Sequence, residues 1–257
     1  RTAMKLDTTN LSAVVTGGAS GLGAAVSAAL RMKGIKVALL DRDVEKGVRY
    51  AAEIGATFCE TDVTDAGSVT AALLQARAAN GQERICVNCA GVAPAAKTVS
   101  RGLAHDLNLF QQAININLIG SFNVASQSAA GMVAAEPIGD ERGVIIHTAS
   151  IAAYEGQMGQ VAYAASKGGI VGLTLPMARD LARDGVRVMA IAPGIFGTPM
   201  VTSMSQEIQD GLAAGIPFPP RLGDPAEFAA LALHIIENAF LNGSVIRLDG
   251  ATRLTLR

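Results

Sequence analysis

Tyr163 and Lys167 are four residues apart, a spacing that places both side chains on one face of a helix. A phenol titrates near 10, so it acts as a base near neutral pH only if its pKa falls by about 3 units, or roughly 4 kcal/mol. A neighbouring ammonium group supplies part of that change because it favours the phenolate. Ser150 follows an apolar run shortly before them, so its hydroxyl could hydrogen-bond to the same substrate oxygen. The three residues indicate acid–base chemistry at a substrate oxygen.

A glycine-rich segment near the start of the chain could bind a nucleotide. It runs Thr16-Gly17-Gly18-Ala19-Ser20-Gly21-Leu22-Gly23, between an apolar run and a segment of helical period. Glycines let the backbone turn sharply and approach a pyrophosphate, which binds the amides at the N-terminus of the helix. An ordinary glycine-rich turn is the alternative, but the order of strand, turn and helix favours dinucleotide binding.

Asp41, at the end of the second apolar run, bears on the choice of dinucleotide. A carboxylate there can accept hydrogen bonds from both hydroxyls of the adenosine ribose, and it repels a 2′-phosphate. Ser20 is not basic, which agrees, whereas Arg42 could pair with a phosphate and indicates the opposite. Together the residues favour NAD over NADP. Asp62-Val63, after the third apolar run, would suit an adenine ring.

The elements that must position these residues alternate along the chain, short apolar runs with longer segments of helical period. This alternation predicts parallel βαβ units, and strands that are apolar throughout predict helices on both faces of the sheet. We therefore expect an α/β fold, a Rossmann-type doubly wound parallel sheet of about seven strands. The expected strands are 11–17, 35–41, 56–63, 85–91, 143–150, 186–194 and 243–250, and the expected helices are 21–33, 43–54, 65–80, 108–135, 163–184 and 225–238.

Three helix ends carry local signals. Asp224 is an expected N-cap, with Pro225 in the first helical position and Glu227 in the third. Gly185 is expected to end the 163–184 helix. Pro176 lies inside that helix and lacks a backbone donor, so it should kink the helix or end it early.

The composition excludes several classes of protein. Half of the 257 residues are hydrophobic, 17% are charged and the net charge is −1. The chain is thus too apolar for intrinsic disorder and lacks the basic excess that favours nucleic acid or an anionic membrane. The three cysteines form no disulfide framework, which predicts a reducing compartment, the cytoplasm or alternatively the mitochondrial matrix. Cys86 and Cys89 form a CxxC pair, but no second pair follows it and His105, His147 and His234 are isolated, so we expect no metal site.

The chain resembles the short-chain dehydrogenase/reductase family from about Leu6 onward. The matching positions are the Thr-Gly-x-x-x-Gly-x-Gly turn, Asn88-Cys89-Ala90-Gly91, Asn117, Ser150, Tyr163, Lys167 and Pro193-Gly194. In that family the tyrosine is the general acid/base, the lysine binds the nicotinamide ribose and lowers the tyrosine pKa, and the serine orients the substrate. The asparagine helps to position a proton-relay water. The resemblance implies these roles for Tyr163, Lys167, Ser150 and Asn117. Cys89 departs from the pattern, because the family usually has a second asparagine there.

Segments of the C-terminal half, such as YEGQMGQVAYAASKGGIVG and FLNGSVIRLDGA, are similar to the type 2 3-hydroxyacyl-CoA dehydrogenase group of that family. The resemblance implies an NAD-dependent homotetramer that oxidises 3-hydroxyacyl-CoA thioesters and also accepts some hydroxysteroids. It implies substrate contacts at Ser150, Gln157 and Tyr163, and cofactor contacts at Gly17, Ser20, Gly21, Leu22, Gly23, Asp41, Asp62, Val63, Cys89, Ala90, Gly91, Tyr163, Lys167, Pro193, Gly194, Phe196 and Thr198.

Two alternatives stay open. A 3-oxoacyl carrier-protein reductase would share the catalytic residues, although such enzymes mostly use NADPH. A catalytically inactive dinucleotide sensor or scaffold would keep the fold but tends to lose the tyrosine or the lysine.

We expect one domain over 6–257, with 6–148 mainly dinucleotide-binding and 149–257 mainly catalytic and substrate-binding. Residues 1–5 are predicted to be an expression scar and start. Lys97 and Arg101 lie in a polar insert and could pair with coenzyme A phosphates, although a solvated loop is favoured. The segment 198–219 predicts a lid over an apolar substrate, with an amphipathic surface helix as the alternative. Its apolar residues are Met200, Met204, Leu212 and Ile216.

Overall fold

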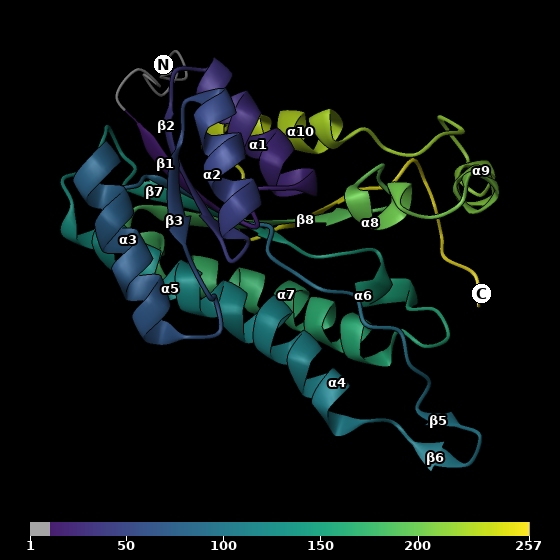
Figure 1. The fold of residues 1–257 in the computed structure, drawn as a ribbon. Helices are drawn as coiled ribbons and strands as arrows, with labels where there is room; N and C mark the ends of the chain where they lie inside the picture. Colours follow the sequence, from purple (N-terminus) through teal and green to yellow (C-terminus); the bar gives the residue numbers. More distant parts are fainter. Residues whose placement is uncertain (1–10, 257) are drawn as a thin grey trace.

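The computed structural model describes residues 11–256, which build one seven-stranded sheet (Figure 1). Neighbouring strands are parallel throughout, in the order β3-β2-β1-β4-β7-β8-β9. The expected α/β class and the sheet of seven strands are confirmed, whereas the prediction for residues 1–5 lies outside the described residues. The strands are β1 (Ser12–Thr16), β2 (Lys36–Asp41), β3 (Thr57–Glu60), β4 (Ile85–Asn88), β7 (Gly143–Thr148), β8 (Val186–Pro193) and β9 (Val245–Leu248).

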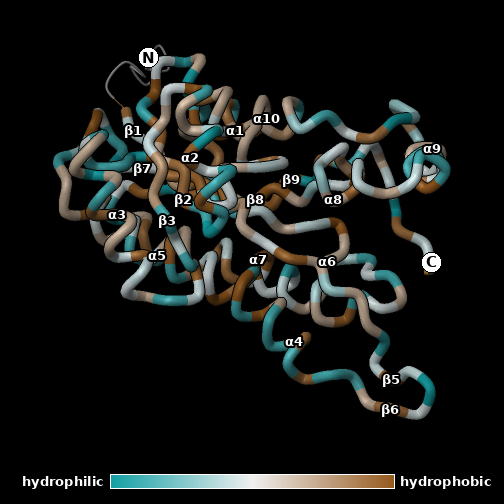
Figure 2. Tube along the Cα trace, viewed as in Figure 1, coloured by the Kyte–Doolittle hydropathy of each residue, from teal (hydrophilic) through white to brown (hydrophobic). Residues whose placement is uncertain are grey.

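Helices cover both faces of the sheet. One face carries α1 (Gly21–Met32), α2 (Val44–Ile54) and α10 (Pro225–Glu237), and the other carries α3 (Ala66–Asn80), α5 (Ser121–Ala134) and α7 (Val161–Asp180). Alternate strand residues enter the two cores, so Val15 packs on the first face and Val14 on the second. Both faces are buried, which explains why the strands are apolar at consecutive positions. Figure 2 shows hydrophobic colours along the central strands.

The helix that contains Pro176 continues past it, contrary to an end at the proline. α7 runs to Asp180, and a 3₁₀ turn at Ala182–Asp184 leads to Gly185, whose φ is +69°. The buried side chains of Thr174, Met177 and Ala178 flank the proline and hold both parts of the helix against the core. Packing therefore outweighs the single missing hydrogen bond.

The expected helix 108–135 is three elements. α4 (Leu107–Ala113) leads into a π-helical turn at Ile114–Gly120, which leads into α5. The wider turn brings Asn117 to a fully buried position, where its side chain pairs with the backbone of Val92. Periodicity alone did not reveal this insertion.

Two features near the carboxyl ends of the strands were not expected, a hairpin and a short helix, whereas a helix in the 198–219 segment was one of the two alternatives. The insert after β4 is a hairpin, β5 (Val99–Ser100) and β6 (Leu103–Ala104), which projects from the body of the molecule (Figure 1). Lys97 and Arg101 are exposed at this hairpin. α6 (Ala152–Glu155) follows Ser150, and the 198–219 segment holds α8 (Pro199–Thr202) and α9 (Gln206–Ala214). Within residues 11–256, no helix has the length and apolar character of a membrane span.

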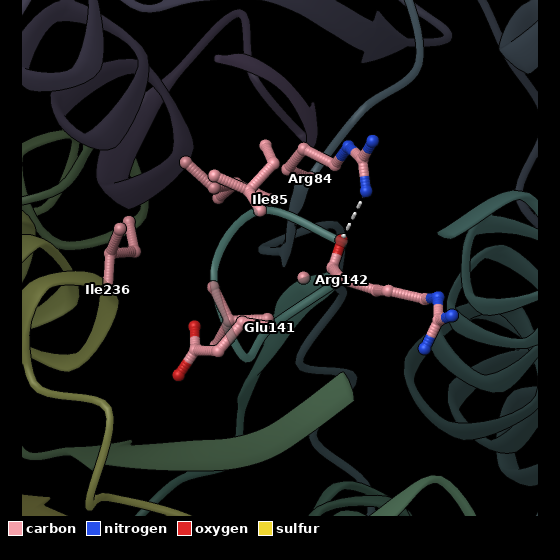
Figure 3. Close-up of a pocket in the computed structure, with 8 residues that line it drawn as sticks. Arg84, Ile85, Glu141, Arg142 and Ile236 are labelled. Carbon is pink, nitrogen blue, oxygen red and sulfur yellow. Dashed lines mark hydrogen bonds between the residues drawn. The ribbon is translucent and has the colours of Figure 1, made fainter. Parts of the chain in front are cut away.

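The amino ends of the strands hold a small cavity that is too small for a substrate. The cavity lies at the amino ends of β4 and β7, beside Ile85, Arg142 and Ile236, and has a volume of about 10 Å³. Arg84 Nη1 donates across it to Arg142 O at 3.2 Å (Figure 3). This volume is about that of one water molecule.

Arg187 and Glu141 form a buried ion pair at that edge. Arg187 Nε donates to Glu141 Oε1 at 2.8 Å, and Arg187 Nη1 donates to the carbonyl of Ile235 at the end of α10 at 2.9 Å. We expect Glu141→Gln to lower the free energy of unfolding by about 2 kcal/mol, because glutamine keeps an acceptor but loses the charge. Urea unfolding measures this change, and a midpoint equal to that of the wild type would contradict it.

Candidate active site

The residues expected to do chemistry lie where the parallel strands end. The glycine turn follows β1, Asp41 ends β2, residues 89–91 follow β4, Ser150 follows β7 and residues 193–198 end and follow β8. Because all these strands run in one direction, their carboxyl ends share one edge, and the crevice there is the ligand site of doubly wound folds. The strand order reverses between β1 and β4, at the centre of that edge.

The turn between β1 and α1 requires glycine. Gly17 has a φ of +62° and Gly21 a φ of +54°, both in the left-handed region. A Cβ on Gly23 would collide with Gly17 O. Ser20 is the N-cap of α1 but makes no side-chain capping hydrogen bond, whereas aspartates cap α2, α3, α4 and α10. The start of α1 therefore fits a pyrophosphate bound at its amides.

Thr16 fastens the loop after β4 to this turn. Its Oγ1 accepts hydrogen bonds from Cys89 N and Ala90 N, at 3.1 Å each. A Cβ on Gly91 would lie 3.2 Å from Asn117 Oδ1, so this loop also reaches the π-helical turn. Thr16 is the first residue of the glycine-rich motif, but the sequence alone indicated no role for it.

Cys89 occupies the position where the resembling family usually has asparagine. Its Sγ accepts a hydrogen bond from Thr148 Oγ1 at 3.5 Å. Burial raises the pKa of the thiol to about 11, so it is protonated at neutral pH. The residue contributes a small apolar group to the crevice and no reactive thiolate.

Asp41 lies directly against the glycine turn. Its Oδ2 accepts a hydrogen bond from Ala19 N at 3.1 Å, and its Oδ1 accepts one from Asp43 N at 3.1 Å. Arg42 is exposed, and its charge affects the carboxylate of Asp62. The pKa of Asp62 is lowered, first by hydrogen bonds from Thr64 and more weakly by the charge of Arg42. Val63 is buried and packs against the π-helical turn at Gly120.

Ser150, Tyr163 and Lys167 meet beyond the end of β7. Lys167 Nζ lies 5.8 Å from the centroid of the Tyr163 ring and donates to Thr148 O at 2.7 Å. The side chain of Ser150 lowers the pKa of Tyr163, and Ser150 Oγ accepts a hydrogen bond from Ala152 N at 3.1 Å. The structure thus brings an acid–base group, a cation and a hydroxyl to one point.

Burial is the main cause of the pKa shifts of Lys167 and Tyr163. It lowers the pKa of Lys167 to about 8. It raises the pKa of Tyr163, and the hydrogen bond with Ser150 opposes that shift only in part. The neighbouring side chains alone therefore do not give the expected net lowering of the Tyr163 pKa. Desolvation of the phenolate raises this pKa by more than those side chains lower it.

Asn117 connects the π-helical turn to α7. Its Nδ2 donates to Val92 O at 2.8 Å and to Ser166 Oγ at 2.9 Å, and Ser166 Oγ donates to Tyr163 O at 2.7 Å. Asn115, two residues before Asn117, is exposed. Ser166 went unnoticed in the sequence, although it lies three residues after Tyr163 and so on a neighbouring part of the same helix.

The remaining expected site residues lie around this crevice. A Cβ on Gly21 would be 3.6 Å from Thr198, so the loop after β8 reaches the glycine turn. Phe196 is buried and packs edge-on against Phe228. Gln157 is half-buried on the loop between α6 and α7. In the 198–219 segment, Met200 and Met204 are exposed and Ile216 is buried.

His147 lies fully buried in β7, next to the catalytic end of the strand, and its Nε2 has no hydrogen-bond partner among the described residues. Burial, and more weakly the charge of Lys167, lowers its pKa to about 4 from 6.5. As the pH falls, His147 takes up a proton in the unfolded chain before it does so in the folded protein. The free energy of unfolding therefore falls by up to about 3 kcal/mol between pH 6.5 and 4.

We expect His147→Gln, which cannot take up this proton, to lose less stability than the wild type over that range. Urea unfolding at about pH 7 and pH 4.5 measures the difference, since the histidine is neutral in both states at the higher pH. Parallel losses in the two proteins would contradict the assignment.

Comparisons with known proteins agree with this geometry. The family model described as short chain dehydrogenase matches residues 12–209. The 3-hydroxyacyl-CoA dehydrogenase type-2 of Bos taurus is 54% identical over 249 residues, and the protein of that name from Drosophila melanogaster is 49% identical over 250. These matches cover 95% of this chain, and 95% and 98% of the two relatives. The crystal structure of 3-hydroxyacyl-CoA dehydrogenase type-2 from Mycobacterium avium superposes with a TM-score of 0.94 at 45% identity, and covers 97% of this chain and 98% of its own.

Proposed function

Because the chain belongs to the short-chain dehydrogenase/reductase family and is an oxidoreductase, we propose that it interconverts 3-hydroxyacyl-CoA and 3-oxoacyl-CoA with NAD. The observation that supports 3-hydroxyacyl-CoA as the substrate is the 54% identity, over nearly the whole chain, to a dehydrogenase named for that compound. The site supports the reaction class, since Ser150, Tyr163 and Lys167 converge at the ligand edge of the sheet. Hydroxysteroids are proposed as further substrates from the family resemblance.

Each catalytic residue has a separate task in this proposal. The phenolate of Tyr163 takes the proton of the substrate hydroxyl as the alcohol becomes a ketone. Ser150 donates a hydrogen bond to the same oxygen and orients it. Lys167 binds the nicotinamide ribose, and its ammonium favours the phenolate. Asn117 holds the relay that returns protons to solvent, and Gln157 lies beside the substrate. A bound nicotinamide ring would supply the acceptor for the hydride of the carbinol carbon.

The residues that would hold the dinucleotide surround the carboxyl ends of the strands. The pyrophosphate would bind the amides at the start of α1, and the carboxylate of Asp41 would accept the ribose hydroxyls. Asp41 already lies against the glycine turn, so a 2′-phosphate would meet its negative charge, which supports NAD over NADP. The proposed contacts are Gly17, Ser20, Gly21, Leu22, Gly23, Asp41, Asp62, Val63, Cys89, Ala90, Gly91, Tyr163, Lys167, Pro193, Gly194, Phe196 and Thr198.

We propose that the segment 198–219 covers an apolar acyl chain. Met200 and Met204 are exposed on and after the short helix α8, and Ile208 is exposed on α9. Short helices with exposed apolar side chains beside a crevice suit a lid that closes over a substrate. The assignment of 6–257 to one domain, with a nucleotide-binding first part and a catalytic second part, stays a prediction.

We further propose a homotetramer in a reducing compartment. Phe122 on α5 and Leu175 on α7 are exposed apolar side chains, which supports burial between subunits. The cysteines Cys59, Cys86 and Cys89 are free, which supports the cytoplasm or the mitochondrial matrix. Light scattering should give the mass of four chains; a monomer would contradict the assembly.

The experiment that tests the proposed substrate is an assay of NADH production across three panels, namely 3-hydroxyacyl-CoA thioesters, hydroxysteroids and simple secondary alcohols. We expect the highest kcat/KM in the thioester panel. A higher value for every member of another panel would overturn the substrate assignment while leaving the reaction class intact.

A further inference from the structure

The loop between Ser150 and Tyr163 is held by chain segments far from it in sequence. Met158 N donates to Leu256 O at 3.2 Å, which fastens the loop to the C-terminal segment. Ala96 N donates to Gly159 O at 2.8 Å, which fastens it to the base of the β5–β6 hairpin. The loop carries Gln157 and connects two catalytic residues, so its position bears directly on the site.

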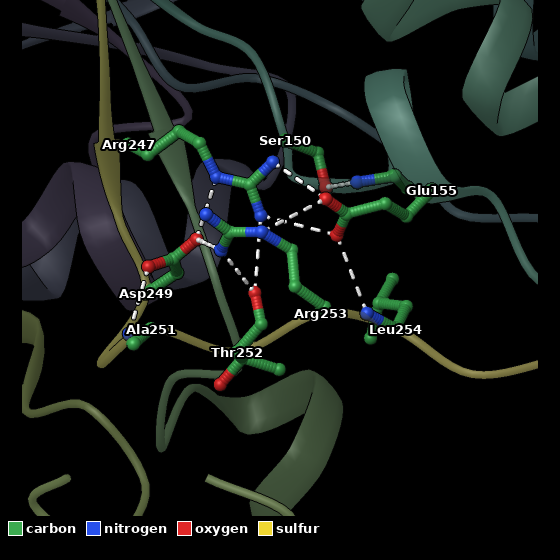
Figure 4. Close-up of polar contacts among 9 residues, drawn as sticks. Ser150, Glu155, Arg247, Asp249, Ala251, Thr252, Arg253 and Leu254 are labelled. Atoms are coloured by element: carbon green, nitrogen blue, oxygen red, sulfur yellow. Dashed lines mark hydrogen bonds and ion pairs between the residues drawn. The ribbon is translucent and has the colours of Figure 1, made fainter. Parts of the chain in front are cut away.

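Glu155, the last residue of α6, makes the strongest of the contacts that hold this loop. Arg247 Nη1 donates to Glu155 Oε1 at 2.8 Å, and Arg247 Nη2 donates to Oε2 at 3.1 Å, a two-pronged pair between α6 and β9 (Figure 4). Leu254 N also donates to Glu155 Oε2, at 3.3 Å. Arg253 Nε lies 3.4 Å from Glu155 Oε1. One carboxylate thus joins the catalytic loop to β9 and to the C-terminal segment.

Arg247 is itself held in place by other contacts. Its Nε donates to Asp249 Oδ2 at 2.7 Å, and its Nη2 donates to Thr252 O at 3.0 Å. The guanidinium carbon lies 5.3 Å from the centroid of the Tyr154 ring, on α6. The side chains of Arg247 and Glu155 are 23% and 22% exposed, so solvent screens the pair only in part.

Ser150 depends on the short helix that this pair secures. Its Oγ accepts a hydrogen bond from Ala152 N, the first residue of α6. α6 is a single turn of 4 residues and its N-cap residue, Ile151, makes no side-chain hydrogen bond, so the helix gains little stability of its own. The Glu155–Arg247 pair fixes the other end of that turn.

We propose that Glu155, through its pair with Arg247, is a positioning residue that fixes Ser150 and the Gln157 loop for the substrate. The proposal rests on the proposed function, because it takes the substrate to bind between this loop and Tyr163. Glu155 is placed to do this because its carboxylate is held by Arg247 on β9 and by Leu254 N of the C-terminal segment. It touches neither substrate nor cofactor in this scheme.

The test compares Glu155→Gln with the wild type under conditions where both are fully folded. We expect kcat/KM for 3-hydroxyacyl-CoA to fall by about 10- to 100-fold, since small errors in placing reacting groups cost this much. The Kd for NADH should stay within about threefold, because the glycine turn is remote from Glu155. Glu155→Asp, which keeps the charge, should recover part of the lost kcat/KM.

Glu141→Gln is the matched control, because it makes the same change in a buried Arg–Glu pair at the opposite edge of the sheet. It should lower stability and leave kcat/KM unchanged. A chain that ends after Arg253 removes the contacts of Leu254 and Leu256 and should lose kcat/KM as Glu155→Gln does. Because both changes release one loop, the double variant should lose little more than either alone.

Wild-type kcat/KM in Glu155→Gln would overturn the proposal, as would an equal loss in Glu141→Gln. Absence of wild-type turnover with any 3-hydroxyacyl-CoA would instead count against the proposed function. In that case hydrogen exchange of the peptide covering 151–160 decides the positioning role on its own. Glu155→Gln should speed exchange there and Glu141→Gln should not; equal rates in the wild type and Glu155→Gln would overturn the proposal.

Discussion

Tyr163→Phe is expected to lower kcat by about 10²- to 10⁴-fold, the range that a positioned acid–base group contributes. Phenylalanine keeps the ring beneath Lys167 Nζ, which lies 5.8 Å from its centroid, and removes only the hydroxyl that exchanges the proton. The variant should therefore fold and bind NADH as the wild type does. Stopped-flow or steady-state formation of NADH measures kcat, and quenching or enhancement of NADH fluorescence measures the Kd.

Tyr154→Phe is the control for this prediction. Tyr154 is a half-exposed tyrosine on α6, close to the same site, and its ring carries the contact with Arg247. Loss of its hydroxyl should change kcat by less than about twofold, since surface changes of this kind are small. Near wild-type kcat in Tyr163→Phe would contradict the mechanism. A large loss of kcat in Tyr154→Phe would show that the assay reports on local packing instead.

Asp41→Asn is expected to lower the preference for NAD over NADP by about 100-fold in kcat/KM. Asparagine has the same shape and can still accept the hydrogen bond from Ala19 N, which is 3.1 Å from Asp41 Oδ2, so the contact with the glycine turn should be preserved. It loses the hydrogen bond from Asp43 N to Oδ1, because an amide has only one acceptor oxygen. Two effects contribute to this change. The charge-assisted hydrogen bonds to the ribose weaken, which lowers kcat/KM with NAD about 10-fold, and the repulsion of a 2′-phosphate disappears, which favours NADP. Initial rates with each nucleotide, at matched substrate concentration, give the ratio.

Asp65→Asn supplies the comparison for that measurement. Asp65 caps α3 through Ser68 N, away from the crevice, and asparagine caps a helix about as well. Its ratio of NAD to NADP should match that of the wild type. A wild-type enzyme that prefers NADP, or an Asp41→Asn variant with an unchanged ratio, would contradict the role given to Asp41.

The fold was predictable because its signals are local. Each strand is buried on both faces and therefore appears as a continuous apolar run, and the Asp224 capping box sets the start of α10 where the residues indicated. The π-helical turn at Ile114–Gly120 was not predictable, because it exists to bury Asn117 against Val92, a contact between separate segments. The small hairpin after β4 turns at Arg101 and Gly102, a weaker signal than Asn-Gly, and its strands of two residues each are too short to show a pattern.

The site was predictable as far as spacing and chain order reach. Tyr163 and Lys167 lie on one helix face, and Ser150 follows a strand, so their convergence could be expected. The direction of the Tyr163 pKa could not, because it depends on how deeply packing buries the phenol. Glu155 could not be singled out either, since its partner Arg247 is brought to it only by the sheet.

The proposed reaction at Tyr163, Ser150 and Lys167 transfers a hydride from C3 of a 3-hydroxyacyl-CoA to NAD. The most direct test supplies unlabelled NAD and 3-hydroxyacyl-CoA deuterated at C3, and follows the label by mass spectrometry. We expect one deuterium in the NADH formed by the wild-type enzyme, with formation slowed by about 10²-fold or more in Tyr163→Phe. Unlabelled NADH, or labelled NADH formed equally fast by the variant, would contradict it.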